Sequence, residues 1–286
     1  VGNPPYLEGP DAGNLAGLHV IGIVNEPVAA ALYYSTTINV SGNGLVYDLG
    51  GGTFDVTIMK ANGHDIDIVC SQGEHELGGV DFDRKILEML QAKYKENFGT
   101  ELLATDEDRA RYEDEAEDIK KTLSRRESAR KMIYGTAGNM RMEITRKDFE
   151  EAIAPLIERT EMLIESALDE SSLDVSEIDN VILVGGSSRI PLVQQKLKKK
   201  FGKEPQSIIN VDECVALGAA LHAGLTLQRE NPDQLDAGLA SSLNGIKLTD
   251  VCNHSYGTIC APLDAETGKH TIKNHVILAK NTALPC

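Results

Sequence analysis

The sequence predicts an α/β fold, and three features of its 286 residues support that prediction. Short apolar runs are typical of strands, and later segments carry apolar residues at helical spacing. Glycine-rich turns follow two of the runs. Strands that alternate with helices in this way are typical of a sheet covered by helices. The strand-like runs are residues 44–47, 56–59, 66–70 and 181–184.

The first elements along the chain are a strand and a helix. Residues 18–24 alternate little and are mostly apolar, which predicts a short strand. Asn25-Glu26-Pro27 then predicts a helix start, because Asn or Glu can cap it and proline suits the first turn. The helix is expected to continue through Leu32.

The middle of the chain predicts two long helices and a strand. Apolar residues from Phe82 to Leu90 repeat at helical spacing, and residues 105–131 carry mixed charges typical of a solvated helix. Residues 140–145 alternate like a strand. Thr145 then precedes an amphipathic helix that is expected to end near Leu168.

The last part of the chain predicts a buried strand, two helices and a change of domain. Residues 181–184 are continuously apolar, as in a strand buried on both faces, and helices are expected over 190–201 and 215–225. The polar residues 226–245 predict a linker. We therefore predict a first domain over 1–225 and a β-rich start of a second domain over 246–286.

Composition limits the function classes and the partners. The net charge of −16 argues against a nucleic-acid partner, and no apolar run approaches the roughly 20 residues of a membrane helix. Five scattered cysteines predict reduced thiols and a cytoplasmic location. Because the chain begins with Val1 and ends within a β-like region, we expect it to be a fragment.

The segment Asp48-Leu49-Gly50-Gly51-Gly52-Thr53-Phe54-Asp55 carries the strongest functional signal. Consecutive glycines allow a tight turn whose N–H groups approach a bulky anion. Acids at strand ends could hold a hydrated metal ion. Phosphate and metal together indicate a nucleotide, although a plain hairpin turn is the alternative.

Four further segments have both a functional and a structural interpretation. The strand that ends at Gly185-Gly186 could present backbone N–H groups to a ligand, or could simply make a close turn. Glu117, Lys120 and Ser124 share a helix face that could bind a ribose or base, or could form a surface ion pair. Glu26 could lie near a metal or attacking water, or cap its helix. The segment 77–83 could contact a nucleotide, or Asp81 could cap a helix there.

Taken together and in order, these segments resemble the Hsp70 family of ATP-dependent chaperones. Asp48 to Asp55 is identical to the second phosphate motif of that family. The resemblance covers most of residues 12–225. The other matching segments are 23–31, 77–83, 117–124, 184–191 and 210–220.

The resemblance implies an actin/hexokinase/Hsp70-type, ribonuclease H-like nucleotide-binding domain, incomplete here, that holds ATP or ADP with Mg²⁺. It implies that Asp48 holds the metal through water and that Glu26, Thr53 and Asp55 take part in catalysis. It further implies unfolded peptides, a J-domain co-chaperone and a nucleotide-exchange factor as partners of the intact protein. The implied nucleotide-binding residues are Gly50, Gly51, Gly52, Thr53, Gly79, Glu117, Lys120, Lys121, Ser124, Gly185, Gly186, Ser187, Arg189 and Asp212.

Departures from the family pattern leave alternatives open. The first phosphate loop of the family, Asp-Leu-Gly-Thr-Thr, and its lysine have no counterpart here, since the first lysine is Lys60. Val80 stands where the family usually has an acid, and the linker lacks the usual leucines. We therefore expect ATPase activity of the intact parent and little of this chain alone. A degenerate or truncated Hsp70 relative that binds nucleotide or a partner without hydrolysis is the alternative, and a bacterial actin-like filament protein is a more distant one.

Overall fold

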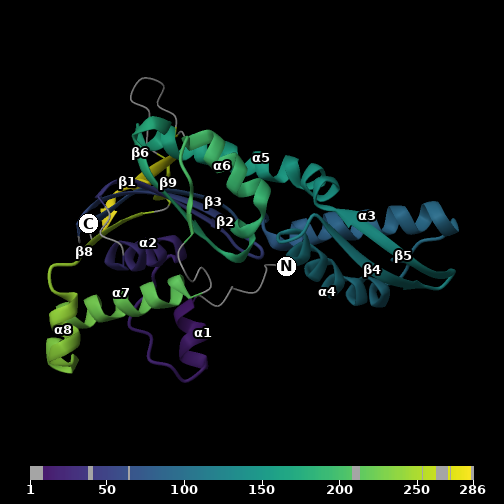
Figure 1. The fold of residues 1–286 in the computed structure, drawn as a ribbon. Coiled ribbons are helices and arrows are strands. Elements are labelled where there is room, and N and C mark those ends of the chain that lie inside the picture. The colour runs from purple at the N-terminus through teal and green to yellow at the C-terminus, as the bar shows by residue number, and fades with distance from the viewer. Residues whose placement is uncertain are drawn as a thin grey trace.

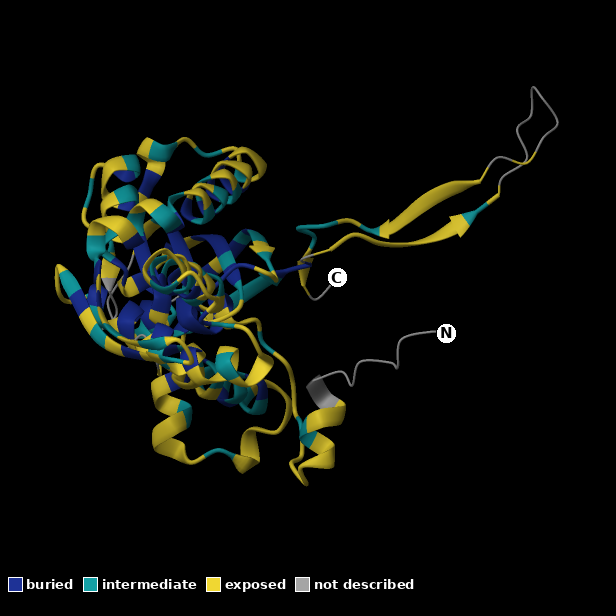
Figure 2. Cartoon of the chain, turned by 90° about the vertical axis from the view of Figure 1, so that its right-hand side faces the viewer, coloured by how far each residue is buried: buried dark blue, intermediate teal, exposed yellow. Residues whose placement is uncertain are grey.

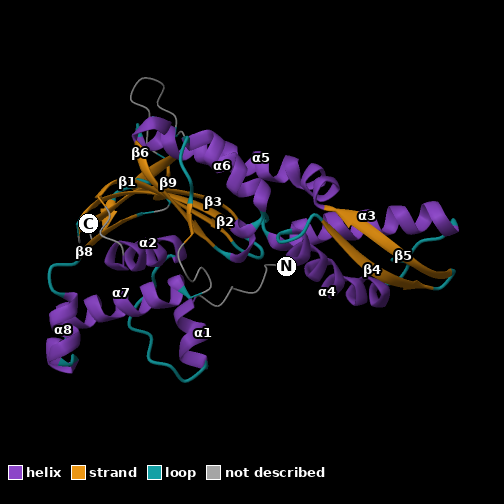
Figure 3. Cartoon of the chain, in the orientation of Figure 1, coloured by secondary structure: helices purple, strands orange, loops and turns teal. Residues whose placement is uncertain are grey.

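The computed structural model describes residues 9–37, 41–63, 65–207, 213–252, 254–261, 270 and 272–284. A sheet of seven strands forms the centre, in the order β11-β8-β3-β2-β1-β6-β7 (Figure 1). Separate two-stranded sheets are formed by β4 with β5 and by β9 with β10. The predicted α/β class is confirmed, and Figure 3 shows the alternation of helices and strands.

The helices and strands have the following bounds. The helices are α1 (Gly9–Leu15), α2 (Glu26–Thr37), α3 (Gly79–Phe98), α4 (Asp106–Leu123), α5 (Arg146–Ser171), α6 (Pro191–Phe201), α7 (Cys214–Glu230) and α8 (Ala237–Leu243). The strands are β1 (Ser41–Leu49), β2 (Phe54–Asn62), β3 (Asp65–Glu74), β4 (Ser128–Gly135), β5 (Gly138–Thr145), β6 (Ile178–Val184), β7 (Gln206–Ser207), β8 (Lys247–Val251), β9 (Tyr256–Cys260), β10 (Lys273–Leu278) and β11 (Ala283–Leu284). No helix in the described part of the chain is long and apolar enough to cross a membrane.

Side chains of the central strands alternate between two hydrophobic cores. Leu45 and Tyr47 of β1 point into a core built with α3, α4, α5 and α6. Val46, between them, points into a second core built with α2 and α7. Successive side chains of a strand point to opposite faces, so a sheet covered on both faces requires apolar residues at consecutive positions. This requirement explains the continuous apolar runs in β1 and β6.

Strand pairing brings two chain segments together at the end of the central strands. β1 pairs with β2 in antiparallel fashion, and Asp48 lies opposite Asp55. β6 runs parallel to β1, and Asp48 lies beside Val184. The carboxyl ends of the parallel neighbours β1 and β6 therefore lie side by side. In open α/β sheets, ligand crevices form at this end of the strands.

Helix boundaries follow local signals in the sequence. Thr145 caps α5, because its side-chain oxygen accepts from the N–H of Asp148 at 3.1 Å. Gly99 ends α3 in the left-handed conformation with φ 72°, which a residue without Cβ adopts most readily. α2 and α7 pack closely through small residues. A Cβ at Gly218 would lie 1.8 Å from the carbonyl oxygen of Ala29.

Two expectations for single elements differ from the structure. Residues 18–24 form no strand, since a strand needs a hydrogen-bonded neighbour and none pairs with them in the described ranges; Leu18 and Ile23 are exposed. The charged segment 105–131 does not stay helical, because α4 ends at Leu123 and β4 follows as the partner of β5.

The segment expected to be a linker is largely helical. Residues 226–230 extend α7, and α8 begins after Asp236, whose carboxylate accepts from the N–H of Gly238 at 2.8 Å. Leu243 of α8 is buried. The polar residues and glycines of 226–245 therefore form helix caps and turns, and not an extended linker.

The last strands lie partly on the central sheet. β8 runs parallel to β3, with Lys247 opposite Asp65, and β11 pairs with the end of β8. The β9–β10 hairpin projects from the body with both strands exposed (Figure 2). The domain division at 226–245 therefore stays a prediction, while β8 extends the sheet of the preceding domain.

Candidate functional site

The turn between β1 and β2 is held open by hydrogen bonds to its carbonyl groups. The N–H groups of Leu77, Gly79 and Val80 donate to the carbonyls of the glycines, at 3.2 Å to Gly52, 3.0 Å to Gly50 and 2.8 Å to Gly51. The N–H groups of Gly51 and Gly52 have no acceptor among the described residues. Both glycines are exposed, and a Cβ on either would meet only open space. These N–H groups are therefore free to bind an anion.

A second turn follows β6, and its geometry requires glycine. Gly185 has φ 77°, and a Cβ there would lie 2.4 Å from the carbonyl oxygen of Leu49. Ser187 connects the two turns, because its hydroxyl donates to the carbonyl oxygen of Gly50 at 2.9 Å. The same carbonyl accepts from Gly79, so three segments meet at one backbone atom.

One face of α4 closes the space above the two turns. The buried ammonium of Lys120 donates to Asp83 at 2.7 Å and to the carbonyl oxygen of Gly79 at 3.0 Å, so it fastens α4 to α3. Glu117 and Lys121 form an ion pair of 3.0 Å on the more exposed part of this face. The hydroxyl of Ser124 donates to the carbonyl oxygen of Lys120.

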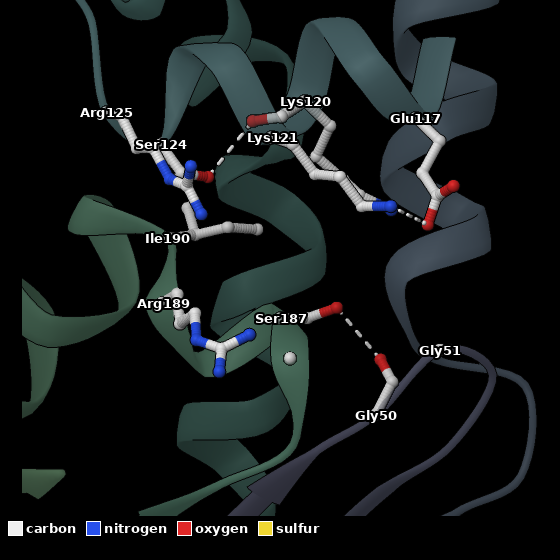
Figure 4. A pocket seen from close by; sticks show the side chains of 11 residues that line it. Gly50, Gly51, Glu117, Lys120, Lys121, Ser124, Arg125, Ser187, Arg189 and Ile190 are labelled. Carbon is white, nitrogen blue, oxygen red and sulfur yellow. Dashed lines mark hydrogen bonds and ion pairs between the residues drawn. The ribbon is translucent and has the colours of Figure 1, made fainter. Parts of the chain in front are cut away.

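These parts enclose a cavity of about 400 Å³ (Figure 4). In Figure 4, α4 lies across the cavity from the two glycine turns. Arg125 and Ile190 also line it and were not among the predicted residues; each directly follows a predicted residue, Ser124 or Arg189. The lining residues are Gly50, Gly51, Glu117, Lys120, Lys121, Ser124, Arg125, Gly186, Ser187, Arg189 and Ile190.

The predicted catalytic carboxylates interact with one another. Burial raises the pKa of Asp48 to about 7, and the neighbouring Glu26 and Asp55 add to the rise. Burial also raises the pKa of Asp55, while His75 opposes the shift and Glu26 adds to it. Acids that repel one another in a buried place favour a cation between them.

A neighbouring cavity of about 520 Å³ contains Glu26, Thr53 and Asp55. His75, just after the end of β3, also lines it, together with His254 and Lys280 from the last part of the chain. The structure thus divides the predicted site between two cavities. Most of the predicted nucleotide-binding residues line the first cavity, and the predicted catalytic residues Glu26, Thr53 and Asp55 line the second. Asp48 is buried at the end of β1.

The described residues fit a metal ion that is held through water. Within the described ranges no group of three His, Cys, Asp or Glu side chains could hold an ion directly. One carboxylate oxygen of Asp48, Oδ2, is buried and has no hydrogen-bond partner among the described residues. A buried carboxylate oxygen needs a partner, and a hydrated cation would supply it.

Comparison with known proteins identifies the family. The model of the family described as "Hsp70 protein" matches residues 9–283. The chain belongs to the Hsp70 family. Two Hsp70 relatives are each 37% identical over 281 residues, or 96% of this chain. They are "Heat shock 70 kDa protein 6, chloroplastic" of Arabidopsis thaliana and "Stromal 70 kDa heat shock-related protein, chloroplastic" of Pisum sativum.

Family membership confirms the predicted Hsp70-type nucleotide-binding fold, and both relatives carry heat-shock names. The Hsp70 family is generally nucleotide-binding. The chain spans 36% and 37% of the length of the two relatives.

The predicted cytoplasmic location is corrected by the same comparison. Both Hsp70 relatives carry names that place them in the chloroplast. The prediction rested on unpaired cysteines, and four free cysteines occur in the described residues. Free thiols indicate reducing conditions and do not distinguish one reducing compartment from another.

The structure does not place every predicted Hsp70 site residue. Asp212 lies outside the described residues. Gly79 does not line either cavity, but its N–H and carbonyl groups hold the first turn and Lys120. Gly52 and Gly185 likewise lie beside the lining rather than in it. Their roles toward a ligand stay predictions.

Proposed function

We propose that this chain binds ATP or ADP with Mg²⁺ in the cavity between α4 and the two glycine turns. The observation that carries the proposal is the convergence of these three parts, distant in sequence, on one cavity of about 400 Å³. Phosphates would accept from the N–H groups of Gly51 and Gly52, and the adenosine would lie toward Ser124 and Arg189. Family membership supports this assignment, because the Hsp70 family is generally nucleotide-binding.

We further propose that the intact protein hydrolyses ATP and couples hydrolysis to the binding of unfolded peptides. Bound Mg²⁺ would neutralise charge on the phosphate oxygens. The chain's own residues would orient the reacting groups. The Asp48 carboxylate would hold water molecules of the cation shell, Glu26 and Asp55 would accept hydrogen bonds from the attacking water, and the Thr53 hydroxyl would orient it. A J-domain co-chaperone and a nucleotide-exchange factor are the proposed partners, and a plastid is the proposed compartment.

Calorimetry with Mg²⁺ and ADP tests the binding proposal. The informative variant is Gly186→Trp, because Gly186 lines the cavity and a Cβ there meets only open space. Gly185 is unsuitable, since its positive φ and its contact with Leu49 would disturb the fold. We expect Gly186→Trp to abolish ADP binding. Gly22→Trp is the matched control, because Gly22 is exposed and does not line the cavity. Equal ADP affinity of both variants would show that ADP does not bind in this cavity.

A second candidate function is nucleotide binding without hydrolysis. It is favoured by Lys120, whose ammonium is already bound to Asp83 and Gly79 and so is not directed at a phosphate. Single-turnover hydrolysis of labelled ATP distinguishes the two functions. Mg²⁺-dependent turnover that is lost in Asp48→Asn supports the ATPase, whereas ADP binding with no turnover supports the second candidate.

A further inference from the structure

A third cavity lies between α7 and β8, away from the nucleotide cavity. Its volume is about 470 Å³. Both elements lie on the side of the molecule opposite α3, β4 and β5 (Figure 1). The lining residues are His222, Leu225, Thr226, Gln228, Arg229, Ile246, Lys247, Leu248 and Thr249.

The charged and titratable side chains of this cavity are all basic. His222 and Arg229 come from α7, and Lys247 comes from the start of β8. None of the lining residues is an acid, although the chain carries a net charge of −16. Across the part of the chain that the structure describes, neither Arg229 nor Lys247 forms an ion pair, whereas Lys120 and Lys196 each pair with a carboxylate. Two cations without partners near a histidine form a place where an anion is favoured.

Two of the basic groups, His222 and Arg229, lie near each other, and Lys247 lines the same cavity. Burial lowers the pKa of His222, and the positive charge of Arg229 lowers it further, which places the two groups within electrostatic reach of each other. Asp250 lies nearby and opposes this shift, but it does not line the cavity. Gln228 donates to the carbonyl oxygen of Ala240 at 3.2 Å, so α8 holds this end of α7 in place.

Part of β8, whose residues line the cavity, has one edge without a strand partner among the described residues. Residues 247–249 pair with residues 65–67 of β3 along one edge only. On the other edge β11 pairs with Asp250 and Val251 and reaches no further. Within the described ranges, the second edge of residues 247–249 therefore has no strand beside it, and unpaired N–H groups there can donate to an anion.

We propose that the α7–β8 cavity binds a phosphate or diphosphate group, held by Arg229 and Lys247 with His222 as a further donor. The guanidinium fork matches two phosphate oxygens, and the ammonium contributes a point charge. The cavity is large enough for such a group and too small for a folded partner. The proposal is independent of nucleotide binding in the cavity beneath α4.

Calorimetry of the whole chain with inorganic pyrophosphate tests the site. Arg229→Gln and Lys247→Gln should each weaken pyrophosphate binding about 10-fold or more, as expected for loss of one charge-assisted hydrogen bond. Lys60→Gln is the matched control, because Lys60 is exposed on the same sheet and lies outside the cavity. Pyrophosphate should also shift the NMR signals of the His222 ring in the parent chain and not in Arg229→Gln. Unchanged affinity in both cavity variants, or an unmoved His222 signal, would overturn the proposal.

The Gly186→Trp variant separates this site from the proposed nucleotide site and identifies the source of the phosphate. We expect Gly186→Trp to bind pyrophosphate as well as the parent does. Loss of pyrophosphate binding in this variant would place the anion beneath α4 and overturn the proposal. If Gly186→Trp also binds ADP in a manner that needs Arg229, the site accepts phosphates carried by a nucleotide. If it binds only pyrophosphate, the site is for the free anion.

Discussion

At the scale of single residues, buried charge decides how the site behaves. Asp48 is 6% exposed, and its Oδ2 atom has no partner among the described residues. Lys120 is also buried, but it is paired with Asp83 at 2.7 Å. An unpaired buried charge destabilises a fold, and a paired one becomes costly when its partner is removed. We therefore expect substitutions of these two residues to change the stability of the fold in opposite directions.

We expect Asp48→Asn to stabilise the fold in the absence of ligand, and more at pH 8 than at pH 5.5. The pKa of Asp48 is about 7 in the folded protein against an ordinary value of 3.8, so the folded state holds more protons between these pH values. The free energy of unfolding then falls as the pH rises through this window. Asparagine does not ionise, and the gain at pH 8 should be about 1–3 kcal/mol. Urea unfolding at both pH values measures it. An equal effect at both pH values would show that ionisation of Asp48 is not the cause.

We expect Lys120→Met to destabilise the fold by about 2–4 kcal/mol, because the Asp83 carboxylate loses its buried partner. The double variant with Asp83→Asn should recover part of that loss, since no carboxylate then remains unpaired. Chemical denaturation of the two single variants and the double variant provides the measurement. A double variant no more stable than Lys120→Met would show that the ion pair is not the reason.

At the scale of elements, small residues set how closely α2 and α7 approach. The carbonyl oxygen of Ala29 lies where a Cβ of Gly218 would be, at 1.8 Å. Ala29 is itself fully buried in the Ala-rich face of α2. The contact involves the α2 backbone, so a side chain at position 218 can be accommodated only if the helices move apart.

Gly218→Ala should therefore destabilise the fold by about 2 kcal/mol or more, although alanine is the better helix former by roughly 1 kcal/mol. Gly224→Ala is the control in the same helix. The nearest atom there is the end of the Leu243 side chain, at 2.8 Å, which can shift. Thermal unfolding of the two variants compares them. A Gly218→Ala variant as stable as Gly224→Ala would mean that α2 and α7 separate at little cost.

Sequence patterns predicted helices with one buried face and strands buried on both faces. The helical spacing of Phe82, Ile86, Leu87 and Leu90 matches the buried face of α3, and the apolar run of β6 matches a strand covered on both faces. The strand expected at 18–24 failed because periodicity reports a preference, while a strand also needs a neighbour. α8 was missed because seven residues are too few for a clear helical period.

Sequence motifs indicated which segments lie around the candidate site, but not the tertiary contacts that hold those segments. The glycine turns and the Glu117–Ser124 face carry recognisable patterns, and the structure brings their members to one cavity. Nothing local in the sequence indicated that Lys120 would be bound to Asp83, or that His254 and Lys280 would line a cavity with Glu26. Those contacts join residues that are far apart along the chain.

At the scale of the whole molecule, Glu170 fastens the last strands to the body. It lies in the final turn of α5 and accepts from the ammonium of Lys280 at 3.0 Å and from the side-chain amide of Asn281 at 2.8 Å. Gln72 of β3 also donates to it. One carboxylate thus joins α5, the central sheet and the turn before β11.

Glu170→Ala should loosen the segment from β8 to β11 while the central strands stay protected. We expect faster hydrogen exchange in β8 and β11, about 10-fold or more for the loss of roughly 1.5 kcal/mol of charge-assisted bonding, and unchanged exchange in β1 and β2. Glu165→Ala is the control on the same helix, since Glu165 pairs with Lys200 of α6 instead. Equal protection of β8 in both variants would remove Glu170 from this role.

The carbonyl oxygen of Gly50, which accepts from both Gly79 and Ser187, has a consequence for how such a site can vary. The acceptor belongs to the main chain, so no side-chain substitution can delete it. A change at Ser187 can remove one of the two donors, whereas the Gly79 donor and the Gly50 acceptor are both main-chain groups and stay in place. The spacing between the two glycine turns is therefore set by the backbone, while the side chains that face the cavity can change. A site of this kind can change its chemistry over generations without losing its dimensions.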